Sequence, residues 1–133
     1  MVGTVSKKRL LIIDDEAALL FLLDRFLTRT GFQVHTCPNA DASLDLLRNV
    51  TDFDLVLVDL TLPDRDGVEL FTEIRGMLPL MPVLLCSGYP FDTDSLPLPL
   101  RGRVWFIQKP FSPRSLSQVI DEILDQDVTK SIL

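Results

Sequence analysis

Groups able to do chemistry follow four separate apolar runs of this sequence. The carboxylic acids Asp14 and Asp15 come after the first run, and Asp59 comes after the second. A hydroxyl, Ser87, and an ammonium group, Lys109, follow two later runs. Each residue alone has an ordinary explanation as a helix cap, a strand end, a turn or a solvated loop residue. Their repeated position after apolar runs predicts one shared site.

These groups suit phosphoryl transfer. Clustered carboxylates repel one another, and oxygen ligands of this kind suit Mg²⁺, which leaves room for a phosphate oxygen. A carboxylate can attack phosphorus and form an acyl phosphate. A lysine and a serine hydroxyl can then contact the phosphoryl oxygens as charge spreads over them. No part of the sequence is typical of a nucleotide site, so we expect Mg²⁺ and no organic cofactor.

Short apolar runs alternate with amphipathic segments along the chain. We expect buried strands at residues 10–13, 55–58, 83–86 and 104–107, and a weaker strand at 33–37. Helices are expected over residues 19–27, 42–50, 67–75 and 113–124, with Gly31 ending the first and Asn39 and Ser112 as caps. This order predicts an α/β fold, with helices on both faces of a parallel sheet and right-handed connections. Ligands of such sheets bind beyond the carboxyl ends of the strands, where the polar residues would meet.

One helix position is interrupted by proline. Pro90, Pro97 and Pro99 fall between the fourth and fifth expected strands. Proline removes a backbone donor and disfavours helix in the residue before it. We therefore expect at most a turn or two between Phe91 and Leu96, with the fourth helix short or absent.

Composition narrows the class of protein. The chain has 133 residues, 47% of them hydrophobic, which predicts one domain with a packed core. A net charge of −6 argues against a nucleic-acid partner. Apolar runs are too short to cross a membrane, and no secretory signal is evident. Cys37 and Cys86 lie in apolar stretches typical of buried, reduced thiols. These features predict a cytoplasmic protein without membrane insertion.

Four motifs, in order, resemble the receiver domain of response regulators in two-component signalling. They are the Asp14-Asp15 pair, the stretch from Asp59 to Gly67 with Pro63 at its centre, the turn Ser87-Gly88-Tyr89, and Lys109-Pro110-Phe111. The resemblance covers about residues 8–126, which leaves residues 1–7 and 127–133 as tails. The serine turn and the stretch around the lysine look most like receivers of hybrid sensor histidine kinases.

The resemblance implies a doubly wound, flavodoxin-like sheet of five parallel strands in the order 2-1-3-4-5. It implies that Asp59 is the phosphoacceptor. The side chains of Asp15 and Asp59 and the backbone carbonyl of Thr61 would ligate Mg²⁺, with Asp14 in support. Lys109 and Ser87 would bind the phosphoryl group.

The resemblance also implies a switch and a set of partners. Phe106 matches the aromatic residue whose rotamer couples to the Ser87 hydroxyl. A histidine kinase or a histidine phosphotransfer protein would donate the phosphoryl group, because the only histidine, His35, lies near the weak second strand. A downstream protein would receive the signal. The chain would be a monomer or weak dimer, either stand-alone or a piece of a hybrid kinase, with no enzymatic activity beyond self-catalysed phosphorylation and dephosphorylation of its aspartate.

Three alternatives remain open. An aspartate phosphohydrolase of the haloacid-dehalogenase type carries an Asp-x-Asp motif after its first strand, where this chain has Asp14-Asp15-Glu16. A flavodoxin-like cofactor module needs a phosphate loop rich in Ser, Thr and Gly at the same place. A pseudo-receiver would bind partners without taking phosphate, and the complete acidic set argues against it.

Overall fold

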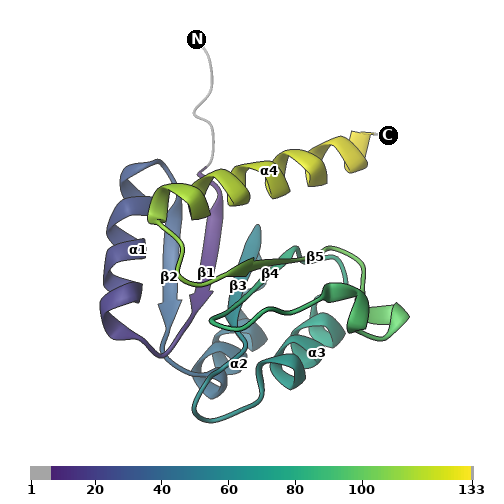
Figure 1. Ribbon diagram of the computed structural model, residues 1–133. Helices are drawn as coiled ribbons and strands as arrows, with labels where there is room; N and C mark the ends of the chain where they lie inside the picture. Colours follow the sequence, from purple (N-terminus) through teal and green to yellow (C-terminus); the bar gives the residue numbers. More distant parts are fainter. Residues whose placement is uncertain (1–6, 133) are drawn as a thin grey trace.

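The computed structural model describes residues 7–132, and the side chains of residues 7–126. Five parallel strands form one sheet in the order β2-β1-β3-β4-β5, which confirms the predicted fold (Figure 1). The strands are β1 (Arg9–Ile13), β2 (Gln33–Cys37), β3 (Leu55–Asp59), β4 (Val83–Ser87) and β5 (Val104–Gln108). Asp59 and Ser87 are the last residues of β3 and β4, so each of these two strands ends one residue later than predicted.

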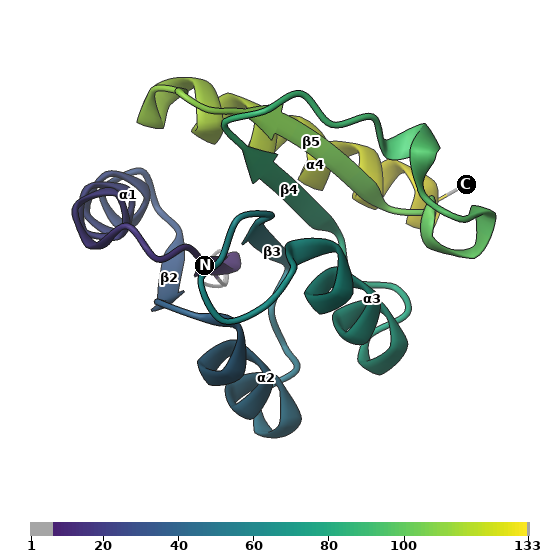
Figure 2. The same cartoon turned by 60° about the horizontal axis from the view of Figure 1, so that its bottom comes forward.

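Helices cover both faces of the sheet. They are α1 (Ala17–Arg29), α2 (Ala40–Asn49), α3 (Gly67–Met77) and α4 (Pro113–Ile132). Helices α1 and α4 lie on one face, and α2 and α3 lie on the other (Figures 1 and 2). Helix α4 continues past residue 126, where the sequence suggested a tail. Within residues 7–132, no helix is long and apolar enough to span a membrane.

The helix ends agree with the predicted capping residues. The side chain of Asn39 accepts a hydrogen bond from the Ala42 amide, and that of Ser112 accepts one from the Ser115 amide. Gly31 has a φ of +110°, a left-handed conformation that glycine adopts without steric cost, just after α1 ends. Helix α2 starts at Ala40, directly after its cap and two residues before the expected start.

The proline-rich segment holds two single turns of 3₁₀ helix in place of a regular helix. These turns span Thr93–Ser95 and Leu98–Leu100. Only the side chain of Leu96 is fully buried between them, at 2% exposure. The prediction of a short or absent fourth helix is confirmed, because the prolines interrupt the backbone hydrogen bonds that a longer helix needs.

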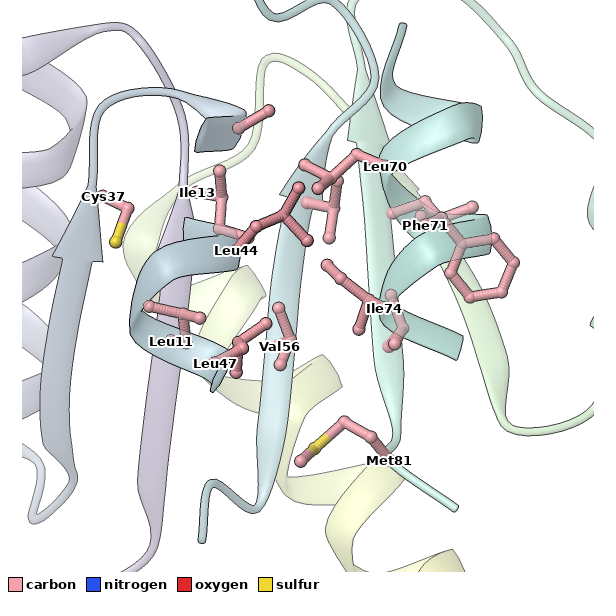
Figure 3. Close-up of a cluster of buried hydrophobic side chains, with 14 of the residues drawn as sticks. Leu11, Ile13, Cys37, Leu44, Leu47, Val56, Leu70, Phe71, Ile74 and Met81 are labelled. Atoms are coloured by element: carbon pink, nitrogen blue, oxygen red, sulfur yellow. The ribbon is translucent and has the colours of Figure 1, made fainter. Parts of the chain in front are cut away.

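Alternate residues of each strand build two core layers. Leu11 and Val56 face α2 and α3, where they meet Leu44, Phe71 and Ile74 (Figure 3). Leu10 and Ile12 face α1 and α4. Every residue of β3 and β4 is buried, as the central strands of a sheet covered on both faces must be. Cys37 and Cys86 are both buried and free.

Candidate functional site

Three carboxylates meet at the edge of the sheet where β1 and β3 end. Asp14 and Asp15 follow β1 directly, and Asp59 is the last residue of β3. Because β1 and β3 are neighbours in the sheet, their ends bring ligand oxygens of all three residues within 4.8 Å of one another. Figure 2 turns this edge of the sheet toward the viewer. Asp14 and Asp59 are each 1% exposed, whereas Asp15 is open to solvent.

Lys109 reaches into this acidic cluster from the loop that follows β5. Its Nζ lies 2.7 Å from Asp14 Oδ2 and 3.2 Å from Asp59 Oδ2. The Lys109 amide donates to the Ser87 carbonyl at 2.8 Å, which extends the pairing of β4 and β5 up to the lysine. Burial alone would lower the pKa of Lys109, but the hydrogen bond and charge of Asp14 and the charge of Asp59 raise it. The lysine is therefore a permanent cation of the site.

The pKa of Asp14 depends on its burial and on its charged neighbours. Burial raises its pKa, and the negative charge of Asp59 adds to this effect. Hydrogen bonds from Lys109 and from the Glu16 amide, which lies 2.9 Å from Asp14 Oδ1, oppose the rise without cancelling it. Removing a carboxylate from water disfavours its charged form, so an ionised Asp14 depends on nearby positive charge.

Asp59 is held in one orientation by Thr61. The amide and the hydroxyl of Thr61 both donate to Asp59 Oδ1, each at 2.9 Å. Oδ2 points to Lys109 instead. Thr61 therefore fixes the plane of the carboxylate, and its own carbonyl belongs to the same short turn.

The loop after β3 closes tightly onto the start of α3. The Leu60 amide donates to the Cys86 carbonyl at 2.8 Å, and the Gly67 amide donates to the Leu60 carbonyl at 3.2 Å. A Cβ atom at position 67 would lie 2.3 Å from the Leu60 Cα. Only glycine allows this approach, which explains why Gly67 begins α3.

Ser87 and Phe106 lie on the same face of the sheet. Phe106 pairs with Leu85, two residues before Ser87 on β4, and side chains two apart on a strand share a face. Ser87 is 4% exposed, and its Oγ accepts a hydrogen bond from the Tyr89 amide at 3.0 Å. Phe106 is half-buried, with its ring centroid 5.9 Å from that of Phe91. Coupling between Phe106 and Ser87 stays a prediction.

Two residues around the site were not predicted from the sequence. Phe91 packs on Phe106, and the Asp64 carboxylate accepts hydrogen bonds from two backbone amides of α2. Phe91 is an apolar residue in a proline-rich segment, which is a weak signal of a packing role. Nothing local could indicate Asp64, because its partners lie on a different element.

The cluster fits a hard divalent cation such as Mg²⁺. All ligand atoms of its side chains are carboxylate oxygens, and two of the three carboxylates are buried side by side. Oxygen ligands with an open side toward solvent are the set that Mg²⁺ prefers, since this ion retains several water molecules.

The sequence is similar to one protein family and to individual proteins within it. Residues 10–121 match the family described as the response regulator receiver domain. The transcriptional regulatory protein GlrR of Escherichia coli K12 is 36% identical over 117 residues, which are 88% of this chain and 26% of the relative. The two-component response regulator ARR14 of Arabidopsis thaliana is 32% identical over 121 residues, 90% of this chain and 31% of the relative. The chain thus spans about a quarter to a third of the length of these curated relatives.

Solved structures share the fold. A CheY-like response regulator receiver domain protein from Methanospirillum hungatei JF-1 superposes with a TM-score of 0.83 at 32% identity. This match covers 94% of the chain and 99% of the solved structure. The similarity therefore extends over the sheet, its helices and the edge that carries the acidic cluster.

Proposed function

This chain belongs to the response regulator receiver family, and from this premise we propose that Asp59 is its phosphoacceptor. Receivers are signalling domains and not classical enzymes, so membership of this family does not favour the alternative of an aspartate phosphohydrolase. One observation carries the proposal. Asp14, Asp15 and Asp59 converge on one edge of the sheet, and the Lys109 ammonium lies between two of them.

The residues of the cluster would hold Mg²⁺ through the side chains of Asp14, Asp15 and Asp59 and the carbonyl of Thr61. When bound, the ion would supply positive charge to the phosphoryl oxygens. Lys109 supplies a second positive charge on the same side, as a point charge and not as a metal ligand. The Ser87 hydroxyl is the donor for a further phosphoryl oxygen.

The chemical step transfers a phosphoryl group from a histidine of the donor to Asp59. An Asp59 carboxylate oxygen forms a bond to phosphorus as the bond between phosphorus and the donor's imidazole nitrogen breaks, and the nitrogen retains the electron pair. The two hydrogen bonds from Thr61 hold the carboxylate plane during the attack. This positioning reduces the entropy lost on reaching the transition state.

The phosphoryl group is proposed to act as a switch through Ser87 and Phe106. Contacts made only to the phosphorylated form would draw the Ser87 hydroxyl toward the acceptor, and Phe106 would move into the vacated space. The shared face of the two side chains supports this coupling. Phe91, which packs on Phe106, would carry the change to the proline-rich segment.

The partners are proposed from the family. A histidine kinase or histidine phosphotransfer protein in the cytoplasm would be the donor, and a downstream protein would read the phosphorylated state. Helix α1 is the best supported docking element, because Phe21 and Leu22 on it are 65% and 49% exposed. The chain would act as a stand-alone receiver or as part of a hybrid kinase, as a monomer or weak dimer.

Intact-mass measurement tests the acceptor. The parent protein incubated with Mg²⁺ and a small phosphodonor should gain one phosphoryl group, and Asp59→Asn should gain none, because an amide is a poor nucleophile. Asp54→Asn, a change of the same chemistry just before β3, is the control and should be labelled like the parent. Undiminished labelling of Asp59→Asn would rule out this residue as the acceptor.

A further inference from the structure

Asp64 links the loop after β3 to the start of α2. Its two carboxylate oxygens accept hydrogen bonds from the amides of Ala40 and Asp41, both at 3.1 Å. These amides belong to the first two residues of α2, on the neighbouring helix of the same face. The Asp64 side chain thus accepts hydrogen bonds from two amides that have no acceptor within their own helix.

The helix start is otherwise capped by its own residue. Asn39 accepts from the Ala42 amide at 2.8 Å, so Asn39 and Asp64 divide the first amides of α2 between them. A negative charge is favourable at this positive end of the helix dipole. The hydrogen bond from the Ala40 amide, with that from Asp41, lowers the pKa of Asp64, although the carboxyl group is exposed to solvent.

Neighbours of Asp64 strengthen the attachment of the loop. Arg65 contacts Asp41 of α2, with its Nε 3.6 Å from the carboxylate, and also pairs with Glu73 of α3. Asp66 accepts from the Val68 amide at 2.8 Å and caps α3. The loop therefore connects α2 and α3 through three consecutive charged residues. Of these, Asp64 makes the hydrogen bonds to the backbone of α2.

The same loop carries Thr61. The start of this loop is attached to Asp59 by the two hydrogen bonds from Thr61. The segment before α2 lies beside the acidic cluster, because the Asp14 amide donates a hydrogen bond to the Cys37 carbonyl at 3.1 Å. We propose that Asp64 is a positioning residue of the metal site, which pins the loop to α2 and thereby keeps Thr61, the proposed carbonyl ligand, in its turn against Asp59. This inference rests on the proposed function of the acidic cluster.

Calorimetric titration of Mg²⁺ tests the inference with a matched pair of variants. Asp64→Ala and Asn39→Ala each remove a cap from α2, but only Asp64→Ala removes hydrogen bonds between the loop and this helix. We expect about a tenfold weaker Mg²⁺ affinity in Asp64→Ala, at the low end for groups that orient metal ligands. Asn39→Ala should lose thermal stability to a similar degree and bind Mg²⁺ like the parent.

Two further measurements separate positioning from general destabilisation. Asp64→Asn keeps one acceptor oxygen and should bind Mg²⁺ with an affinity between those of the parent and Asp64→Ala. It also carries the test if Asp64→Ala does not fold. In the parent, the amide resonance of Ala40 should titrate together with the Asp64 carboxyl group, and in Asp64→Asn this titration should vanish.

The outcomes are distinct from those of the proposed function. Mg²⁺ affinity unchanged in Asp64→Asn and Asp64→Ala, or weakened equally in Asn39→Ala, would overturn the positioning role while the acidic site stands. A parent protein that binds no Mg²⁺ and takes no phosphoryl group would overturn the proposed function, and the positioning role would fall with it.

Discussion

The Lys109 ammonium forms an ion pair with Asp14, with Nζ 2.7 Å from Oδ2 and the carboxylate side chain only 2% exposed. The same ammonium lies 3.2 Å from Asp59. Lys109 is thus an internal counter-ion for two buried carboxylates, in addition to its proposed role toward a phosphoryl group.

Lys109→Ala should destabilise the metal-free protein. Removing one partner of a fully buried ion pair costs about 3–5 kcal/mol, and we expect on the order of 2 kcal/mol because Lys109 is partly exposed. Mg²⁺ affinity should stay equal or rise, since the variant leaves more negative charge in the cluster. Urea unfolding in chelator and calorimetry measure the two effects. The exposed Lys8→Ala is the control, and equal unfolding free energies for the two variants would contradict the counter-ion role.

Asp14→Asn should flatten the dependence of metal-free stability on pH. Burial raises the pKa of Asp14 above its ordinary value of 3.8, so the folded protein holds this proton more strongly than the unfolded chain. The associated stability is fully present below the unfolded pKa and is lost as pH rises through the folded pKa. The variant should therefore gain stability relative to the parent as pH increases.

Thermal unfolding in chelator between about pH 4 and pH 7 measures this difference. Mg²⁺ competes with the same proton, so the parent's Mg²⁺ affinity should fall as pH drops through the raised pKa of Asp14. A stability difference between parent and Asp14→Asn that does not change with pH would show that burial of this carboxylate has no such effect.

Gly67→Ala should damage both the fold and the site. Its new Cβ would lie 2.3 Å from the Leu60 Cα, so the backbone of the loop or of α3 must move. We expect a loss of about 1–3 kcal/mol, as for overpacked cores, and slower phosphorylation of Asp59. Gly76→Ala is the matched control on the same helix, since nothing lies within 4 Å of its added Cβ. That control should be neutral or stabilising by up to about 1 kcal/mol, and a similar loss in both variants would contradict the close approach.

The positions of the strands and the helix caps could be predicted because each depends on local sequence, whereas the order of the strands was implied by the resemblance to receiver domains. The acidic cluster could be predicted because its residues follow strands whose carboxyl ends meet at one edge of a parallel sheet. The apolar runs and the polar residues that end them carry their own signal, as do Asn39 and Ser112 at helix starts. The hydrogen bonds that the amides of α2 donate to Asp64 could not be predicted, because they join residues about two dozen apart through the packing of two elements. The same holds for Phe91 against Phe106. No helix or strand periodicity in the sequence connects the positions of these partners.

The proline-rich segment should exchange its amide hydrogens rapidly. The amides of Ser95, Leu96 and Leu100 donate to carbonyls three residues earlier, so these bonds are confined to isolated turns. Opening one turn breaks little else, which gives a low local unfolding free energy. We therefore expect fast hydrogen exchange from Phe91 to Leu100 in the unmodified protein, and slow exchange in β4 as the internal control. Strong protection of the whole segment would show a stable structure there and contradict this expectation.

A phosphoryl mimic should change the protection of this same segment through Phe91. Beryllium fluoride with Mg²⁺ would draw Ser87 toward Asp59 and move Phe106, whose ring lies 5.9 Å from that of Phe91. Phe91→Ala removes this contact and should abolish the change in exchange that the mimic causes. Leu98→Ala alters a side chain of the same segment that is 75% exposed, and it should leave the change intact. If both variants respond to the mimic like the parent, the signal leaves Phe106 by a route that does not include Phe91. Loss of the response in Leu98→Ala as well would instead mean that the segment responds as one unit, with no special part for the aromatic pair.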